Sequence, residues 1–206
     1  SLGVKSAKGL DGASVCIQTG TTTELNLAEY FKGNNIKYNP VPIETNAEAQ
    51  ELYKAGRCDV YTTDASGLYA TMMSFDNPSD HMVLPEIVSK EPLGPVVRHG
   101  DDQWADIVSW VLRAMMAAEE KGITSKNVKE LAAKDNKDKE VNRLLGKDPL
   151  QGLSKLGLSP DWAVNVISQV GNYQESFEKH LFPLTIKRGM NALYRDGGLH
   201  YIPPIK

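Results

Sequence analysis

Short apolar runs alternate with helix-like segments in the first third of the chain, and this alternation constrains the fold more than any other feature. The runs that read as strands are 13–18, 37–43 and 58–64, and segments 24–34 and 46–56 between them have helical patterns. Strands separated by helices of about 10–15 residues are the signature of β-α-β units. We therefore predict an α/β fold with a sheet dominated by parallel strands.

The sequence changes character about halfway along the chain, and the second half is predicted to be mainly helical. Apolar residues recur three and four positions apart over 104–116, which is typical of an amphipathic helix ending near Gly122. Similar patterns predict helices over 162–177 and 187–194. The highly charged stretch 126–148 is interpreted as a solvated helical face rather than a binding tail.

Charge and hydropathy exclude two classes of protein. The chain has 206 residues with 23 basic and 26 acidic side chains, a near-balance that argues against a nucleic-acid-binding surface. No apolar run approaches the ~18 residues needed to cross a bilayer, and no signal-peptide pattern opens the sequence. We expect a soluble globular protein. Because the first residue is Ser1 rather than Met, we also expect a chain processed or excised from something longer.

The loop at 18–24 (QTGTTTE) is the strongest candidate for a ligand site. It lies between a predicted strand and a predicted helix, at the carboxyl end of a strand, where open α/β sheets bind ligands. The hydroxyls of Thr21, Thr22 and Thr23, with free N–H groups of the following helix, suit a carboxylate or a phosphate. The alternative is that Thr21 or Thr22 only caps the helix, which is a common role for threonine.

Asp64 is the second candidate, because it ends the next strand-like run and precedes a predicted helix over 65–73. Its carboxylate could receive a ligand ammonium, or it could only cap that helix. Taken together, the two loops place a carboxylate-binding cradle and an ammonium-binding acid on one edge of one sheet. That pairing matches an α-amino acid, which carries one negative and one positive group at a fixed separation.

Catalytic and metal-binding readings have little support. The sequence contains no Walker A loop and no GxGxxG, HExxH or GxSxG motif. The histidines are scattered, without the i, i+4 pair of a metal site: His81, His99, His180 and His200. We therefore predict no catalytic residue, no metal ligand and no cofactor.

The two cysteines, Cys16 and Cys58, lie in separate strand-like runs. If those strands are neighbours, a disulfide bridge is possible. The alternative is two buried free thiols, because cysteine is among the most buried residue types. The residues by themselves leave both readings open.

Five segments resemble a known family. They are Ser14 to Glu24, 56–68 (GRCDVYTTDASGL), 90–104 (KEPLGPVVRHGDDQW), and the C-terminal stretches 170–179 (VGNYQESFEK) and 184–206. The chain resembles the periplasmic solute-binding proteins of polar and general L-amino acid ABC transporters, most of all the general L-amino acid branch. The resemblance runs across essentially all of the chain.

The resemblance implies a periplasmic-binding-protein fold of type II, in which two α/β lobes close on one amino acid. Residues 1–97 would form the second lobe, and 98–206 would be the return crossover with a helical region that belongs with lobe one. The N-terminal part of lobe one, which in the family carries an arginine for the ligand's α-carboxylate, would be missing. No arginine of this sequence fits that motif, so we expect an incomplete form with weak binding or none.

The resemblance also implies the site and the setting. Carried over by position, Thr21, Thr22 and Thr23 would contact the ligand and Asp64 would hold its α-ammonium, with Gln18 and Thr62 lining the same edge. The partners would be an L-amino acid and an ABC transporter permease in the inner membrane, and the location would be periplasmic. That location, and adjacent strands in the family, favour the Cys16–Cys58 disulfide.

Two alternatives belong to other functional classes. The chain could be a non-binding interaction protein, forming homo-oligomers through helical faces such as 104–116 that the missing lobe would normally cover. It could also be an enzyme on the same scaffold, because some relatives of this fold catalyse eliminations. Glu24 is then the one candidate for a general acid in the cleft, although a solvated helix residue is the simpler interpretation.

Overall fold

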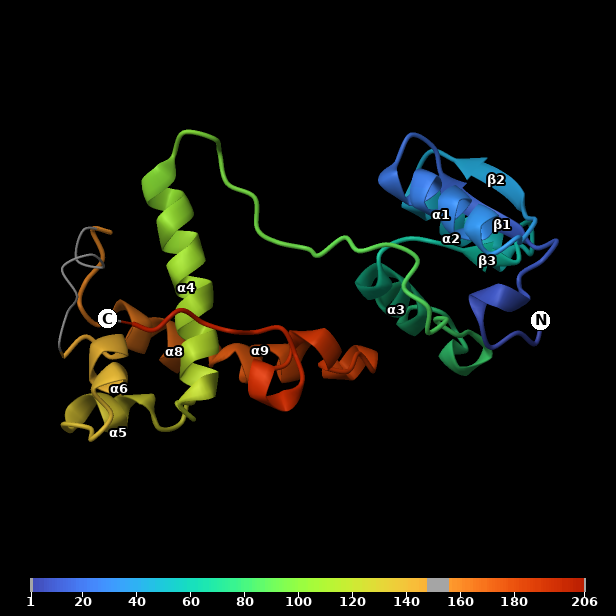
Figure 1. Ribbon diagram of the computed structural model, residues 1–206. Coiled ribbons are helices and arrows are strands. Elements are labelled where there is room, and N and C mark those ends of the chain that lie inside the picture. Colours follow the sequence, from blue (N-terminus) through green and yellow to red (C-terminus); the bar gives the residue numbers. More distant parts are fainter. Residues whose placement is uncertain (1, 148–155, 206) are drawn as a thin grey trace. The chain divides into compact units, whose positions relative to one another are not determined.

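The computed structural model describes residues 2–147 and 156–205 of the chain (Figure 1). They divide between two compact units, Ser1–Leu93 and Gly94–Lys206. The division falls a few residues before the boundary at residues 97 and 98 that the sequence suggested. No helix within the described ranges is long and apolar enough to span a membrane.

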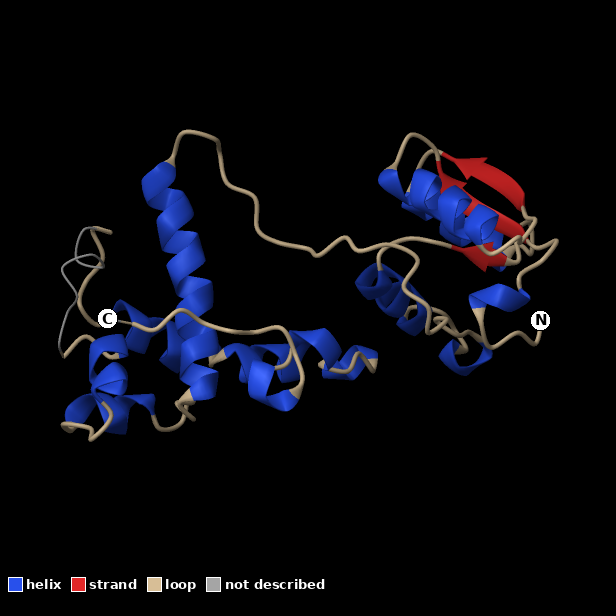
Figure 2. Cartoon of the chain, in the orientation of Figure 1, coloured by secondary structure: helices blue, strands red, loops and turns tan. Residues whose placement is uncertain are grey.

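The first unit is built on a parallel sheet, as the alternating runs predicted. Its strands are β1 (Ser14–Gln18), β2 (Asn39–Ile43) and β3 (Val60–Tyr61), in the order β2-β1-β3 (Figure 2). Five residue pairs join β1 to β2, whereas two pairs join β1 to β3. The third strand is therefore much shorter than the predicted run.

The helices of the first unit follow the strands. They are α1 (Thr22–Gly33), α2 (Asn46–Lys54) and α3 (Ala65–Met73), with short 3-10 turns at Ala7–Gly9 and Pro78–Asp80.

The helices α1 and α2 cover opposite faces of the sheet. Successive side chains of a strand point to opposite faces, so the contacts of neighbouring β1 residues show which helix covers which face. Val15 and Ile17 pack in one buried cluster with Phe31 of α1. Cys16, between them in sequence, packs in a second cluster with Ala49 of α2. The central strand β1 is thus buried on both sides, which is typical of parallel sheets.

Cys16 and Cys58 form a disulfide, with their Cα atoms 5.6 Å apart. This confirms the pairing that the family resemblance favoured over two free thiols. The two residues are 42 positions apart in sequence. In the loop-entropy model, closing a loop of that length stabilises the folded state by about 4 kcal/mol.

The second unit is helical over most of its described length. Its α-helices are α4 (Asp102–Glu120), α5 (Val128–Ala133), α6 (Lys139–Leu144), α8 (Trp162–Val170) and α9 (Tyr173–His180). Short 3-10 helices follow at Phe182–Leu184, Gly189–Asn191 and Tyr194–Asp196. The predicted helix over 104–116 is confirmed as the middle of α4.

The single helix predicted over 162–177 is wrong, because the chain forms two helices there. Gly171 has a φ of +84°, outside the helical region, and it interrupts the hydrogen-bond ladder. Asn172 then starts α9 with a capping box: its side chain accepts a hydrogen bond from the Glu175 N–H, and the Glu175 carboxylate accepts one from the Asn172 N–H. The apolar spacing continued across this break and hid it.

The helix predicted over 187–194 is also wrong, since only 3-10 turns form there. An isolated parallel bridge between Leu193 and His200 folds the chain back on itself instead. The fold-back brings Gly198 against Ala192, where an added Cβ would lie 1.9 Å from the Ala192 carbonyl oxygen. Only a residue without a side chain fits this approach.

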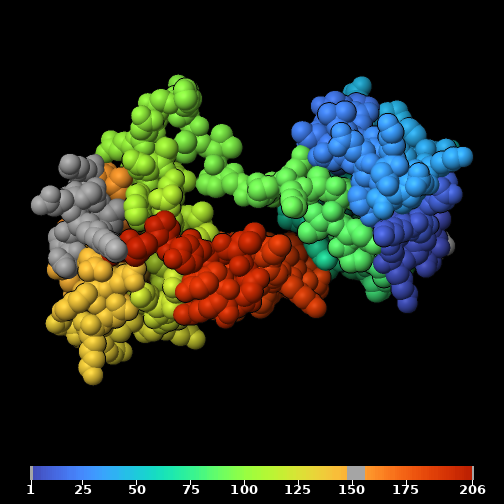
Figure 3. All heavy atoms as spheres, in the orientation of Figure 1, coloured from blue at the N-terminus to red at the C-terminus, as the bar shows by residue number. Residues whose placement is uncertain are grey.

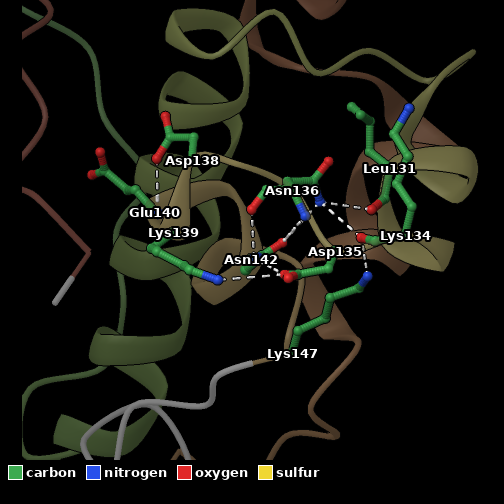
Figure 4. Close-up of polar contacts among 9 residues, drawn as sticks. All are labelled: Leu131, Lys134, Asp135, Asn136, Asp138, Lys139, Glu140, Asn142 and Lys147. Atoms are coloured by element: carbon green, nitrogen blue, oxygen red, sulfur yellow. Dashed lines mark hydrogen bonds and ion pairs between the residues drawn. The ribbon is translucent and has the colours of Figure 1, made fainter.

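The charged stretch predicted over 126–148 is only partly a solvated face over residues 126–147; residue 148 lies outside the described residues. Asn142 of α6 is 3% exposed, and its amide donates to Asp135 Oδ1 (2.6 Å) and to the Asn136 carbonyl (3.0 Å). Its oxygen accepts from the Asn136 backbone and side chain, both at 2.9 Å (Figure 4). Because every buried polar atom of Asn142 has a partner, the amide can be buried among polar neighbours without a penalty.

The C-terminal segment completes the core of the second unit. Ile202 and Ile205 are buried in the same cluster as Ala118, Val128 and Ile167 of the helices. The two prolines between these buried positions are exposed, and the C-terminal segment is drawn in red in Figure 3.

Candidate functional site

The candidate residues lie on one edge of the sheet in the first unit. The strands β1, β2 and β3 end at Gln18, Ile43 and Tyr61, and because they are parallel, these carboxyl ends share an edge. Each strand leads within four residues into the N-terminus of a helix, α1, α2 or α3 (Figure 1). Three loops, each leading to the N-terminus of a helix, therefore leave the sheet at this edge, which we call the carboxyl edge.

Thr21 is the N-cap residue of α1. Its hydroxyl donates to the Gln18 carbonyl (2.7 Å) and accepts from the Glu24 N–H (3.3 Å). The Glu24 carboxylate reaches back and accepts from the Gly20 N–H at 2.8 Å. Gly20 allows this turn because its φ is +71°. The capping role that sequence analysis left open for Thr21 is present, and the side chain of Glu24 is tied to the same cap.

Thr22 and Thr23 open the first turn of α1. Thr22 is exposed and Thr23 is half-buried. Backbone N–H groups in the first turn of a helix have no partner within the helix, and the positive end of the helix dipole lies there. These two residues therefore offer N–H groups and hydroxyls suited to an anionic oxygen.

Asp64 occupies the N-cap position of α3, but its side chain makes no capping hydrogen bond. The residue is exposed. Burial is the main cause that raises the pKa of the nearby Tyr61 phenol; the Thr63 side chain acts against the increase, and the negative charge of Asp64 adds to it. The Asp64 carboxylate therefore does not cap the helix that it precedes, and its charge acts at the carboxyl edge.

Gln18 and Thr62 have local roles at the same edge. The Gln18 amide donates to the Glu44 carbonyl at 2.9 Å, which ties the β1 loop to the β2 loop. The Thr62 N–H lies 3.4 Å from the Cys16 carbonyl and extends the contact between β3 and β1 by one residue. Both residues lie at the carboxyl edge, and their contact with a ligand stays a prediction.

Sequence reasoning missed a polar link between β3 and α2. The Tyr61 hydroxyl donates to Asn46 Oδ1 at 3.0 Å. Asn46 is the first residue of α2, directly after the N-cap Thr45. The sequence signal was the polar run Glu44-Thr45-Asn46 after the second strand, which marks a third loop at the carboxyl edge.

The carboxyl edge carries negative charge. Glu24 and Glu48 both accept hydrogen bonds from backbone N–H groups, those of Gly20 and Glu44. Asp64 adds a carboxylate that is not engaged in a cap. Such an edge suits the ammonium group of a ligand, because opposite charges attract and like charges repel.

A metal centre has no counterpart in the part of the chain that the structure describes. No three His, Cys, Asp or Glu side chains come together there in a way that could hold a metal ion.

Comparison with known proteins places these features in context. The chain is 55% identical over its full length to a general L-amino acid-binding periplasmic protein of Rhizobium johnstonii. It is 53% identical to a glutamate/glutamine/aspartate/asparagine-binding protein of Rhodobacter capsulatus. In both comparisons the chain spans 61% of the relative's length. A scan against protein-family models gave no match.

A solved structure shares the fold of this chain. An ABC transporter periplasmic binding protein from Brucella ovis, with glutathione bound, matches 99% of this chain with a TM-score of 0.91 and 50% identity. The match covers 64% of that protein. The fold expected from the resemblance is confirmed.

Proposed function

The chain is homologous over its whole length to periplasmic binding proteins of amino-acid ABC transporters, and from this homology we propose that it belongs to a protein that captures L-amino acids outside the cytoplasm. That protein would deliver them to a permease in the inner membrane. The relatives are periplasmic binding proteins, which supports a periplasmic location. Because the chain spans 61% of their length, the proposal concerns the longer protein and the contribution of this chain to it.

The observation that carries the proposal is the pair of complementary groups on the carboxyl edge. Asp64 would hold the α-ammonium, and the N-terminus of α1 at Thr22 and Thr23 would hold the α-carboxylate. These groups follow β3 and β1, which are adjacent parallel strands, so both loops leave the sheet at the same edge. Thr21 would contribute mainly by fixing the loop, because its hydroxyl is already bonded on both sides.

The expected affinity of the carboxyl edge by itself is low. A hydrogen bond to a charged group contributes about 1.5–3 kcal/mol, and at an exposed edge two of them near the lower value give a dissociation constant in about the millimolar range. Closed ligand pockets bury roughly 70–90% of the ligand, which an exposed edge does not do. We therefore propose weak binding to this chain and tighter binding to the longer protein.

Titration followed by nuclear magnetic resonance tests the proposal. The chain would be unfolded and refolded to remove carried ligand, then titrated with glutamate, glutamine, aspartate and asparagine, which the name of one relative specifies. Glutathione belongs in the same panel because the solved relative holds it. We expect saturable amide shifts at Thr22, Thr23 and Asp64. Saturable shifts confined to other residues, or no shifts at high ligand concentration, would overturn the assignment.

Substitution of Asp64 separates a ligand contact from a general charge effect. Asp64→Asn should abolish the ligand-induced shifts, because the amide keeps the shape of the carboxylate and removes its charge. The matched control is Asp76→Asn, an exposed aspartate just beyond α3 in the same unit. Equal loss of binding in both variants would mean that the whole negative surface, and not Asp64, attracts the ligand.

A second candidate function is self-association, favoured by apolar side chains that the second unit exposes. Trp104 is 52% exposed, Leu199 70% and Tyr201 72%. Exposed apolar side chains of this size are typical of interaction surfaces when they cluster. Light scattering over a hundredfold range of protein concentration would test it: a constant monomer mass would exclude this candidate.

Catalysis receives no support from the carboxyl edge. The general acid considered from the sequence, Glu24, accepts a hydrogen bond from the Gly20 N–H and so helps to cap α1. The homologues are named as binding proteins. We propose that the protein binds and releases its ligand unchanged.

A further inference from the structure

The strand β3 is short and pairs with the rest of the sheet over two residues. It consists of Val60 and Tyr61, and its ladder with β1 contains only the pairs Val15–Val60 and Cys16–Tyr61. By comparison, β2 pairs with β1 over five residues. A two-residue ladder provides few hydrogen bonds, so the position of β3 depends on contacts outside the ladder.

One such contact lies before the strand. Ser14 donates its N–H (2.9 Å) and its hydroxyl (2.6 Å) to Asp59 Oδ2. In return, the Asp59 N–H donates to the carbonyl and hydroxyl oxygens of Ser14. The hydrogen bonds from Ser14 lower the pKa of Asp59. Both residues are accessible to water, which competes for these bonds.

The second contact is the disulfide. It joins Cys16, at the centre of β1, to Cys58, two residues before β3. Both cysteines are buried, at 0% and 3% exposure. A covalent bond in the core is not weakened by water, so it is the strongest link between β3 and the rest of the sheet.

Beyond β3, the chain runs directly into the candidate site. The Thr62 N–H is 3.4 Å from the Cys16 carbonyl, a long hydrogen bond, and Asp64 follows two residues later. The side chains of the strand itself contribute the Tyr61–Asn46 hydrogen bond and the packing of Val60 and Tyr61 against the two buried clusters. Whatever fixes Cys58 therefore fixes the start of the segment that carries Asp64.

We propose that the Cys16–Cys58 disulfide is a covalent latch that holds the segment 59–64 on the sheet. Reduction by a dithiol adds two electrons and two protons to the S–S bond and gives two thiols, while the dithiol is oxidised to its own disulfide. In the reduced form, β3 and residues 62–64 separate from β1, while the pairing of β1 with β2 and the packing of α1 remain. The effect on ligand binding rests on the proposed function of Asp64.

Hydrogen exchange measured by mass spectrometry tests the latch without a ligand. The full chain would be compared before and after reduction by dithiothreitol, with reduction verified by an intact mass two hydrogens higher. We expect exchange in the segment 59–64 to accelerate by about tenfold or more, as for local opening. Exchange in α1 and β2 should change by less than about threefold. Equal acceleration throughout the unit, or none in 59–64, would overturn the proposal.

Two variants make the test independent of the reductant. Cys16→Ala/Cys58→Ala removes the latch and should reproduce the local acceleration. Ile43→Val is the matched control, because Ile43 lies in the same buried cluster but on β2. It should weaken the unit without selecting 59–64. If the control also opens that segment first, then β3 is simply the weakest part of the sheet and the disulfide is not its latch.

A binding measurement separates the latch from the proposed function. If Asp64 holds the ligand, the reduced chain should bind at least about tenfold more weakly than the oxidised chain, since the binding-competent arrangement becomes less populated. Local opening with unchanged affinity would uphold the latch and place the ligand away from Asp64. If neither form binds a ligand, the exchange measurement still decides the latch.

Discussion

Gly198 shows how one residue decides a local fold in this chain. The chain folds back between Leu193 and His200, and this brings Gly198 against Ala192. A Cβ added to Gly198 would overlap the Ala192 carbonyl. The helix expected over 187–194 fails for this reason. A local pattern reports the spacing of side chains along one segment, whereas the fold-back depends on a contact between two segments.

Gly198→Ala should therefore lower the free energy of unfolding of the second unit by about 2–4 kcal/mol, because the backbone must move to make room. Gly94→Ala is the control, since a Cβ added there would meet open space and its φ is not positive. The control should stay within about 0.5 kcal/mol of the parent. Urea unfolding followed by circular dichroism measures both; a neutral Gly198→Ala would contradict the close approach.

Glu175 should make the stability of the second unit depend on pH. Burial by itself would raise the pKa of its carboxyl, but hydrogen bonds from Ser125 and from the Asn172 N–H outweigh burial and lower it below its usual value of 4.5. A lowered pKa in the folded state means that the carboxylate stabilises the fold above about pH 4.5. This contribution is lost as the pH falls through the folded-state pKa.

Thermal unfolding between pH 7 and pH 2.5 would measure this dependence. Glu175→Gln should destabilise the unit near neutral pH and flatten the decline of its melting temperature below about pH 4.5. Glu178→Gln is the control, because Glu178 accepts its hydrogen bond from Gln174, an exposed residue one turn earlier on the same helix. Parallel pH profiles for the parent and Glu175→Gln would show that another group causes the decline.

At the scale of elements, the sequence predicted the strands and helices that are set by hydrophobic periodicity within one segment. The alternation of strands and helices in the first 65 residues is present, and so is the long helix α4. The break between α8 and α9 was missed, because Trp162 and Phe177 continue one apolar stripe across Gly171. The candidate loops could be predicted because each directly follows a predicted strand. The hydrogen bonds of Thr21 and Glu24 in the cap of α1 could not, because they depend on the backbone geometry of the loop.

Asn172 should hold the α8–α9 break in place. It caps α9, and its amide also donates to the Ile123 carbonyl at 2.8 Å. Asn172→Ala removes the cap and leaves a buried carbonyl without a partner, so we expect a loss of about 2–3 kcal/mol in the free energy of unfolding, measured by urea titration. Asn165→Ala, at an exposed position of α8, serves as the control, with little change. A loss of equal size at Asn165 would mean that the cap and the Ile123 contact are not what makes Asn172 important, because alanine is by itself the better helix former.

At the scale of the whole molecule, the segment that joins the two units is open to solvent. Leu93 is 72% exposed and Val96 is 95% exposed. Exposed connecting segments with few contacts are preferred sites of proteolysis. We expect limited trypsin digestion to cut first after Arg98, which is also exposed.

Mass spectrometry of the early fragments would show residues 1–98 with the disulfide intact and residues 99–206. Arg98→Gln should delay the first cut by about tenfold or more, because cleavage of folded regions requires local opening. Early cleavage inside α1 or α4 would contradict the division into two compact units.

The burial of Ile202 and Ile205 affects the order in which the two units can fold. The backbone of Ile205 is held by Glu140 and Arg143, more than sixty positions earlier in sequence. The core of the first unit, in contrast, draws only on residues before position 94. During synthesis the first unit can close early, whereas the core of the second cannot be completed until Ile202 and Ile205 have emerged from the ribosome.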